Sequence, residues 1–460
     1  MTASAIASSA AKLPPTLPGY PFIGSALAFA RAGGLPLKFL QDSFAEYGDV
    51  FRAKVFDRSI VVVSHPDMLH EILVKRVSEF HKPIVISPDK PRSLERFLGA
   101  GILTGDHAEW RPQRKLIQPL MHAKHIEGYA ETMVQHGAAM LNGWHAGQTL
   151  DVHAAMTQVT MSIIAETMFG TDVSQTSDLE FAGRKGQEIA LADLMLPLPT
   201  LLMGPRNRRA AVVNGVLSAL VARFMAERRE TGHGDRTDLL SLLMQTTDED
   251  GQPMPDDFVR NNILTLFFAG HETTANTLTW ALHFLDRNPE VKARLQHEVD
   301  TALDGRAPTL EDLRSLPYTL MVIKEAMRAE PVVAALSRVV TEDNEIGGYH
   351  LDKGTLVLLP IYLMHHDPRW WVNPERFDPE RFSAENEPNI HKFAYIPFGG
   401  GPRVCIGNHF SMMESQLLLA MMVSQFELAH APGHEVVPTR QITTSPKTGL
   451  WMQLSARHRE

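Results

Sequence analysis

The chain divides into a long helical stretch flanked by shorter alternating ones. From about Ala108 to Glu330, apolar residues recur at three- and four-residue spacing, the period of amphipathic helices. Residues 50–64, VFRAKVFDRSIVVVS, alternate and turn, which predicts a β-hairpin. After Pro331, the segments LSRVVTED, EIGGYHL and TLVLLPIY predict short strands. This order predicts a mostly α fold with small β-sheets at its edges.

The most apolar helical stretch is residues 263–285, ILTLFFAGHETTANTLTWALHFL. A Glu lies in its middle, and a carboxylate at that depth is costly in lipid. We therefore expect a helix buried in protein and no transmembrane segment. A last helix is predicted over residues 409–428 and a closing hairpin over residues 442–456.

No internal repeat and no linker divides the chain. The first residues, MTASAIASSAAK, lack the basic and apolar regions of a signal peptide. We expect a disordered leader over residues 1–16, one domain over residues 17–460, and a cytoplasmic monomer.

Composition narrows the function classes. The formal net charge of -9 disfavours a nucleic-acid partner. One cysteine in 460 residues excludes an internal disulfide and cysteine-rich zinc or iron–sulfur sites.

That cysteine lies in FGGGPRVCIG, residues 398–407. A lone cysteine between apolar residues is usually a small buried hydrophobe. A phosphate-binding loop does not fit, because no GK[ST] follows. Glycines, however, let backbone N–H groups approach a sulfur, and Arg403 is expected to favour the thiolate over the thiol. A thiolate is also an axial ligand that haem proteins use to favour O–O cleavage.

FGGGPRVCIG resembles the haem-binding signature of the cytochrome P-450 family. The fixed positions of that signature are all filled, by Phe398, Gly401, Arg403, Cys405 and Gly407. The resemblance identifies Cys405 as the ligand of the haem iron.

AGHETT, residues 269–274, is similar to the family's oxygen-binding motif. Ala269 and Gly270 are expected to leave room for a ligand beside the helix. The hydroxyl of Thr273 can bond the carbonyl of Ala269 and bend the helix. By resemblance, Thr273 and Glu272 are the catalytic pair that delivers protons to dioxygen. The alternative is a kinked core helix.

KEAMR, residues 324–328, resembles the family's buried Glu-x-x-Arg pair. Glu325 and Arg328 share a helix face. The family adds an Arg from a later Pro-Glu-Arg-Phe segment, and Arg381 fits better than the earlier copy at residues 374–377. An exposed helix salt bridge is the commoner meaning of such a pair.

WRPQR, residues 110–114, resembles the family's Trp-x-x-x-Arg helix, which contacts a haem propionate. Trp110, Arg114, Arg338 and Arg403 are therefore expected near the propionates, because guanidinium groups match carboxylates in geometry and charge. Pro112 is expected in the first turn of this helix, where proline is tolerated.

The resemblance runs from about Leu17 to Leu454. It implies a triangular helical prism around haem b (iron protoporphyrin IX) and a monooxygenase that uses O2 as co-substrate. With no fused reductase, electrons from NAD(P)H would arrive through a separate ferredoxin or flavodoxin and its reductase. A basic patch at Arg111, Lys115 and Lys124 is a candidate docking surface, although an ordinary solvated helix face explains it equally well.

The substrate pocket implied by the resemblance is apolar, which predicts a fatty acid, terpenoid or steroid-like substrate. Its expected residues are Phe267, Phe268, Ala269, Val332, Val333, Ala334, Ala335, Leu336, Ile442 and Thr443. The apolar segment at residues 192–204 would be a lid, a peripheral membrane contact or a core-facing helix pair.

Two rival functions remain. One is a peroxide-driven haem-thiolate enzyme, although such members usually lack the acid–alcohol pair. The other is a haem-binding sensor without turnover, which would not need a proton relay.

Overall fold

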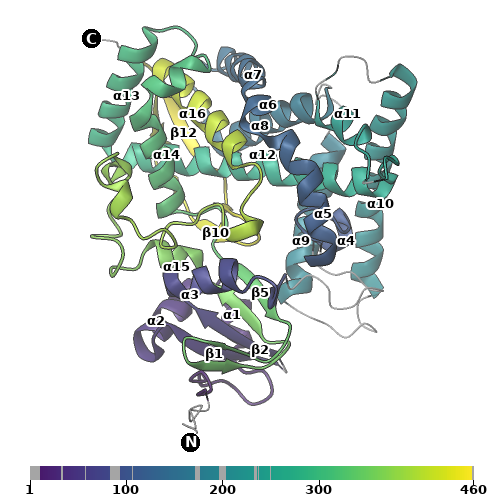
Figure 1. The fold of residues 1–460 in the computed structure, drawn as a ribbon. Coiled ribbons are helices and arrows are strands. Elements are labelled where there is room, and N and C mark those ends of the chain that lie inside the picture. The colour runs from purple at the N-terminus through teal and green to yellow at the C-terminus, as the bar shows by residue number, and fades with distance from the viewer. Residues whose placement is uncertain are drawn as a thin grey trace, which may run out of the picture.

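The computed structural model describes residues 11–32, 35–56, 58–82, 94–105, 107–170, 177–195, 204–232, 236, 238–248 and 250–457. A large helical part lies above a smaller β-rich part, with the chain running from the β-rich end upward (Figure 1). The helices are α1 (Ala26–Ala32), α2 (Leu37–Tyr47), α3 (Pro66–His70), α4 (Glu95–Leu98), α5 (His107–Ile117), α6 (Ala123–Glu127), α7 (Ala130–Asn142), α8 (Val152–Phe169), α9 (Ser177–Met195), α10 (Gly204–Thr231), α11 (Leu239–Met244), α12 (Asp256–Arg287), α13 (Pro289–Leu303), α14 (Pro317–Ala329), α15 (Ile361–His365) and α16 (Asn408–Gln425).

The main sheet has the strand order β1-β2-β8-β5-β3. Its first two strands form the predicted hairpin, with Val50 opposite Val63. Strand β8 returns parallel to β2, and the remaining pairs are antiparallel. The strands are β1 (Val50–Val55), β2 (Arg58–Val63), β3 (Phe80–His81), β5 (Leu336–Val340) and β8 (Leu356–Leu359).

Three small sheets complete the β structure. Strand β12 pairs with both β4 and β9, while β6–β7 and β10–β11 are two-stranded. Their bounds are β4 (Thr149–Asp151), β6 (Asn344–Ile346), β7 (Tyr349–Leu351), β9 (Phe426–His430), β10 (Pro438–Arg440), β11 (Thr444–Pro446) and β12 (Trp451–Ala456).

Helix α12 crosses the middle of the helical part (Figure 1). Its 32 residues pack against α8, α14 and α16. The buried Trp280 donates its indole N–H to the carbonyl of Thr444, which ties the helix to β11. The apolar stretch at residues 263–285 is therefore a helix buried in protein, as predicted.

Three sequence predictions need correction. Residues 12–16 are not a disordered leader, because Lys12 bonds Gly348 and His350, and Pro15 accepts from the N–H of Arg52. The last helix ends at Gln425, and Phe426 begins strand β9. Residues 442–456 do not form one hairpin: β11 pairs with the earlier β10, and β12 pairs with β4 and β9.

One helix of the described residues, α10, is long and apolar enough to cross a membrane. This is weak support for a span, because buried helices of globular proteins pass the same criterion. Val213, Leu217, Val221 and Phe224 form a buried stripe along it, with exposed residues between them. This spacing is that of an amphipathic helix covering a core.

Candidate active site around Cys405

The loop that carries Cys405 packs against Leu73 of the β-rich part and leads directly into helix α16. The N–H of Cys405 donates to the carbonyl of Phe398 at 2.9 Å. Gly401 has a φ of +71°, and a Cβ there would lie 2.0 Å from the carbonyl oxygen of Leu73. Only glycine fits such a position. Gly407 precedes the first residue of α16, so the helix begins directly after the loop.

The thiol of Cys405 is reachable by solvent, yet protein atoms surround it closely. Burial raises its pKa, whereas the backbone N–H of Gly407 and the charges of Arg114 and Lys82 lower it. The N–H donor was anticipated from the glycines. Arg114 and Lys82, which the sequence did not single out for this role, also act on the sulfur.

Arg403 turns toward α5. Its guanidinium carbon lies 4.5 Å from the ring centroid of the buried Trp110, and it donates to the carbonyl of Gly105 at 3.0 Å. Arg114, on the same helix, donates to the carbonyl of Val404 at 2.8 Å. Pro112 lies inside α5 and not in its first turn, because the helix begins earlier, at His107.

Arg338, Arg403 and Lys82 form a cationic cluster beside the cysteine. Burial and Arg403 lower the pKa of Arg338 to about 10. Burial, Arg338 and Arg403 lower the pKa of Lys82 to about 7. The Nε of Arg338 is buried without a hydrogen-bond partner. Among the described residues, neither Arg338 nor Lys82 has an ion pair with a carboxylate. Such a cluster suits an anionic ligand.

Helix α12 presents the acid–alcohol pair. The hydroxyl of Thr273 donates to the carbonyl of Ala269 at 2.7 Å, as the sequence predicts. Residues 262–267 are buried and Phe268 is half-buried, but Ala269 is exposed, so the helix borders an open hollow at this point. Gly270 was expected to leave room there, but it faces α8: a Cβ would lie 2.6 Å from Cδ1 of Ile164. Its role is close helix packing.

Glu272 is held by side chains from two other segments. The hydroxyl of Thr443 donates to its Oε1 at 2.5 Å, and Nε2 of Gln187, on α9, donates to its Oε2. The carboxylate therefore lies between α9 and the turn that joins β10 to β11.

The predicted pocket residues fall into two groups. Phe267 is fully buried, and its ring packs against Phe169 and His271 in the helical core. Val332 and Ala334 are also buried, and their carbonyls accept hydrogen bonds from Thr444 and Tyr362. The others keep some exposure: Phe268, Ala269, Val333, Ala335, Leu336, Ile442 and Thr443. Residues 196–203 of the predicted lid segment lie outside the described residues.

The structure brings Glu325, Arg328 and Arg381 together. Arg328 donates through Nε and Nη2 to the two carboxylate oxygens at 2.7 and 2.8 Å, and both side chains are fully buried. The Nε of Arg381 reaches Oε1 of Glu325 at 3.4 Å, and the N–H of Asp378 donates to it at 2.8 Å. The remaining guanidinium donors bind backbone carbonyls, so the pair is fully hydrogen-bonded.

Sequence reasoning missed three residues of this region. Lys82 and Gln187 lie on segments without a motif and reach the site only through the fold. Glu414, on α16, is fully buried and neither carboxyl oxygen has a recorded hydrogen-bond partner. Burial raises its pKa well above the usual value, although the neighbouring hydroxyl of Thr274 acts in the opposite direction. An acid nine residues after the cysteine was a visible but unused signal.

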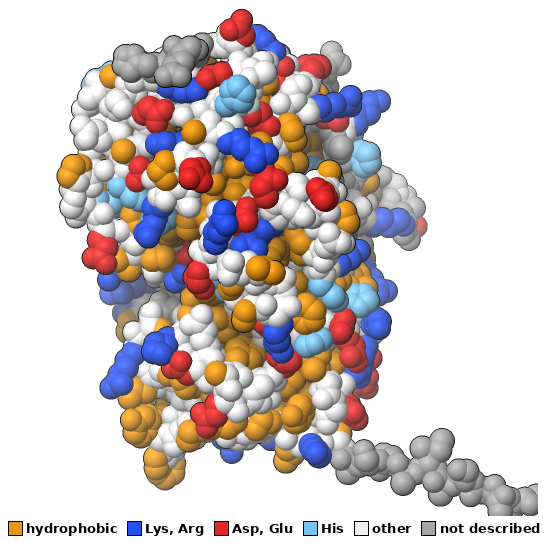
Figure 2. Space-filling view, turned by 90° about the vertical axis from the view of Figure 1, so that its left-hand side faces the viewer, with side chains coloured by type: hydrophobic (Ala, Val, Ile, Leu, Met, Phe, Trp, Pro, Cys, Tyr) orange, Lys and Arg blue, Asp and Glu red, His pale blue; other side chains and the backbone are white. Residues whose placement is uncertain are grey.

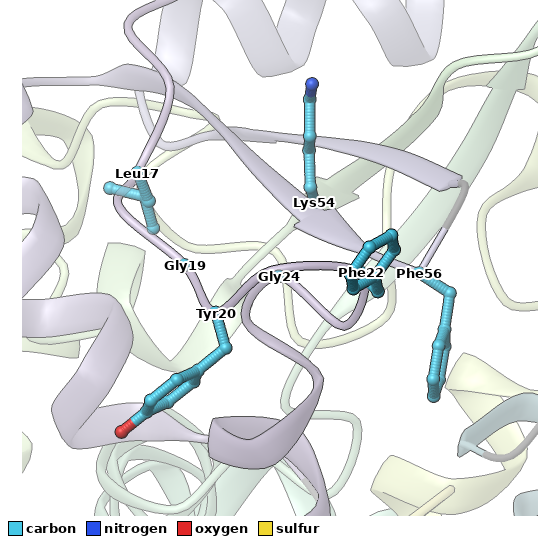
Figure 3. Close-up of a pocket in the computed structure, with 7 residues that line it drawn as sticks. All are labelled: Leu17, Gly19, Tyr20, Phe22, Gly24, Lys54 and Phe56. Carbon is cyan, nitrogen blue, oxygen red and sulfur yellow. The ribbon is translucent and has the colours of Figure 1, made fainter.

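Two surface hollows lie away from these residues. One, of about 160 Å³, lies in the β-rich part and is lined by aromatic and small residues (Figure 3): Leu17, Gly19, Tyr20, Phe22, Gly24, Lys54 and Phe56. Apolar side chains also gather toward this end in the space-filling view (Figure 2). The other, of about 500 Å³, lies between α5 and α6 and is lined by Lys115, Gln118, Pro119, His122, Lys124 and His125.

A comparison with known protein families identifies the family of this chain. The family model described as "Cytochrome P450" matches residues 14–452. The chain belongs to the cytochrome P450 family. This chain is therefore a P450 monooxygenase, which is a haem-dependent oxidoreductase.

Relatives and solved structures agree. Cyclooctatin synthase of Streptomyces melanosporofaciens is 34% identical over 92% of each chain. Cyclooctat-9-en-7-ol 5-monooxygenase of the same organism is also 34% identical, over 91% of this chain and 90% of its own length. The crystal structure of the cytochrome P450DA heme domain is 26% identical and has a TM-score of 0.87, covering 97% of this chain and 98% of that one. The mostly α fold predicted from the sequence is thereby confirmed.

The residues of this P450 fit its cofactor. The accessible sulfur of Cys405 could ligate the haem iron, and the cluster of Arg338, Arg403 and Lys82 would supply cations for the propionates. When bound, haem supplies the reductive activation of dioxygen.

Proposed function

We propose that this P450 inserts one oxygen atom from O2 into a lipophilic terpenoid, with Cys405 as the haem ligand and Thr273 and Glu272 as the proton-delivering pair. The observation that carries the proposal is the accessible thiol of Cys405 in a loop that directs the Gly407 N–H at its sulfur. Each such donor favours the thiolate form that the chemistry needs.

The test of this assignment is spectroscopic. Reduced protein with carbon monoxide is expected to show the red-shifted Soret band of thiolate ligation, and Cys405→His to abolish it. A wild-type spectrum typical of histidine ligation would refute the assignment of Cys405.

Thr273 and Glu272 would act on protons. The Thr273 hydroxyl already donates to Ala269 and keeps its lone pairs for a water molecule. The carboxylate of Glu272, half-buried between α9 and the β10–β11 turn, would pass protons from solvent toward that water. Both residues lie within one helical turn of Ala269, and the hollow there would also receive the substrate.

A terpenoid is favoured among the lipophilic classes. The exposed pocket positions Phe268, Ala269, Val333, Leu336 and Ile442 are apolar, which suits a hydrocarbon skeleton. Two relatives at 34% identity are a cyclooctatin synthase and a cyclooctat-9-en-7-ol 5-monooxygenase. The experiment is turnover of a panel of cyclic terpenoids, fatty acids and steroids, with products identified by mass spectrometry. Exclusive oxidation of fatty acids would overturn the terpenoid assignment.

The electron donor would be a ferredoxin or flavodoxin, reduced by NAD(P)H through its reductase. The hollow between α5 and α6 supports this, because Lys115 and Lys124 line it and Lys115 adjoins Arg114, which contacts the cysteine loop. A cytoplasmic monomer is the proposed state of the protein, and the buried stripe of α10 favours a core helix over a membrane span.

A further inference from the structure

Three polar side chains meet at one corner of the hollow beside Ala269. They come from α9 (Gln187), α12 (Glu272) and the turn between β10 and β11 (Thr443). Both Gln187 and Thr443 donate to the carboxylate of Glu272, one to each oxygen. All three side chains are half-buried, so solvent or a ligand can reach them.

The surroundings of this corner are apolar. Phe268 precedes Glu272 by one helical turn and packs toward α9, where a Cβ at Gly183 would meet its ring. Ile442 adjoins Thr443 and packs against the helical core. A polar cluster in an apolar binding site usually fixes the orientation and identity of the ligand.

The hydrogen-bonding capacity of the cluster is only partly used. The carboxylate can accept about four hydrogen bonds, and two are made. The hydroxyl of Thr443 keeps its lone pairs, and the amide of Gln187 keeps one N–H and its carbonyl oxygen. The cluster can therefore both donate to and accept from one more small polar group.

We propose that Gln187, Glu272 and Thr443 form a subsite for a hydroxyl group of the substrate, so that the enzyme takes a lipophilic alcohol. This rests on the proposed function and specifies its substrate class. A hydroxyl donates one hydrogen bond to Glu272 and accepts one from Gln187, which matches the unused capacity of the cluster. One acceptor site of Glu272 then stays open, so the carboxylate can still take part in proton delivery.

Other ligand classes fit this subsite poorly. A substrate carboxylate would lie against the carboxylate of Glu272, and like charges repel in a site with few waters. A hydrocarbon or an ether gives Glu272 no donor. A site built to hydrogen-bond a hydroxyl discriminates strongly against analogues without one, because its own polar groups then lose their partner.

The test measures binding to the oxidised holoenzyme through the absorption change of its haem, without turnover. Two matched ligand sets serve as probes: cedrol, its methyl ether and cedrane, and geranylgeraniol, its methyl ether and geranylgeranoic acid. At least one alcohol is expected to bind about tenfold to a hundredfold more tightly than its ether and its deoxy or acid partner, the range for one hydrogen bond to a charged group.

Variants locate the effect. Gln187→Leu and Thr443→Val should each reduce the alcohol preference at least about fivefold, since each removes one member of the cluster. Thr443→Ser should keep it, because the hydroxyl remains. Thr439→Val is the matched control: Thr439 lies on β10 opposite Ser445 and outside the cluster.

The proposal is overturned if neither alcohol binds better than its partners, or if the preference survives both Gln187→Leu and Thr443→Val. The carbon monoxide spectrum of each variant reports folded, haem-loaded protein, so a folding defect is recognised separately. Terpenoid oxidation with no alcohol preference would leave the proposed function standing and refute only this subsite.

Discussion

Individual side chains at the site act mainly through hydrogen bonds that the fold completes. Thr273 is the clearest case, because its hydroxyl bonds the carbonyl of Ala269 and lies beside the exposed part of α12. The bond to the backbone carbonyl fixes the position of the hydroxyl, and its oxygen can still accept a hydrogen bond.

Thr273→Ala should change the fate of oxygen more than its consumption. Reduction and oxygen binding do not need the hydroxyl, whereas proton delivery does, and such contributions are typically about 100- to 10,000-fold. The variant should keep the thiolate spectrum and release hydrogen peroxide in place of most of the product. The measurement is product and peroxide formed per NAD(P)H consumed. Undiminished coupling would show that protons take another path.

Gly270 is a second residue whose substitution should lower the stability of the fold. A Cβ at Gly270 would meet Cδ1 of Ile164 at 2.6 Å, so Gly270→Ala should push α12 and α8 apart. Overpacking of this kind costs about 1–3 kcal/mol. Denaturant unfolding should show the loss, and Ile164→Val in the same chain should recover much of it. Additive effects of the two substitutions would mean that the contact does not limit packing.

Elements built from distant segments hold the site in place. The Glu325–Arg328 pair joins α14 to the stretch at residues 372–381, through the carbonyl of Arg376, the N–H of Asp378 and the side chain of Arg381. The sequence contains Pro-Glu-Arg-Phe twice, and the structure supplies a natural control: the side chain of Arg376 is exposed, whereas that of Arg381 is largely buried.

Glu325→Ala should cost about 3–5 kcal/mol, since it leaves a buried guanidinium without its partner. Arg381→Ala should cost less, and Arg376→Ala should change stability by no more than about 0.5 kcal/mol. The yield of haem-loaded protein and the unfolding midpoint report the order. Equal losses for Arg376→Ala and Arg381→Ala would contradict this assignment.

Helices α5 and α6 carry the cationic residues proposed to meet the electron donor. Arg111→Glu with Lys115→Glu should slow reduction by an acidic ferredoxin at low salt, and the difference should shrink as salt rises. Substrate binding should stay unchanged, because both residues are exposed on the outer surface. Stopped-flow reduction measures the effect. Equal rates at low ionic strength would place the donor elsewhere.

The sequence predicted the parts of the site that local motifs encode. The cysteine loop, the Thr273–Ala269 bond and the Glu325 pair depend on fixed spacing within a loop or a helix, so they could be predicted. Lys82 and Gln187 could not, because only long-range packing brings them to Cys405 and Glu272. The end of α16 was misjudged for a similar reason: Phe426 continues a helical pattern, but pairing with β12 draws it into a strand.

At the scale of the whole molecule, buried histidines should set the acid limit of stability. Burial and the neighbouring His430 lower the pKa of His283 to about 4, and burial with Arg328 lowers that of His366 to about 4. A neutral buried histidine stabilises the fold above the unfolded pKa of about 6.5. The unfolded chain binds the proton first, so stability falls as the pH drops from about 6.5 to 4.

His283→Phe should remove part of that dependence. A shift from 6.5 to about 4 corresponds to about 3 kcal/mol at most. Unfolding curves measured at pH 7 and pH 4.5 should differ less for the variant than for the wild type. Identical pH dependence would mean that His283 is not buried neutral.

The cationic cluster has a consequence for how much enzyme accumulates when the supply of haem is limited. Lys82, Arg338 and Arg403 come from three distant parts of the chain, and they repel one another where the β-rich and helical parts meet. A dianionic haem bound there would relieve that repulsion, and as a ligand of the folded state it would add its binding free energy to stability. Chains made faster than haem would lack this stabilisation and would therefore be degraded more readily by proteases. The amount of enzyme would then follow haem synthesis as closely as it follows transcription.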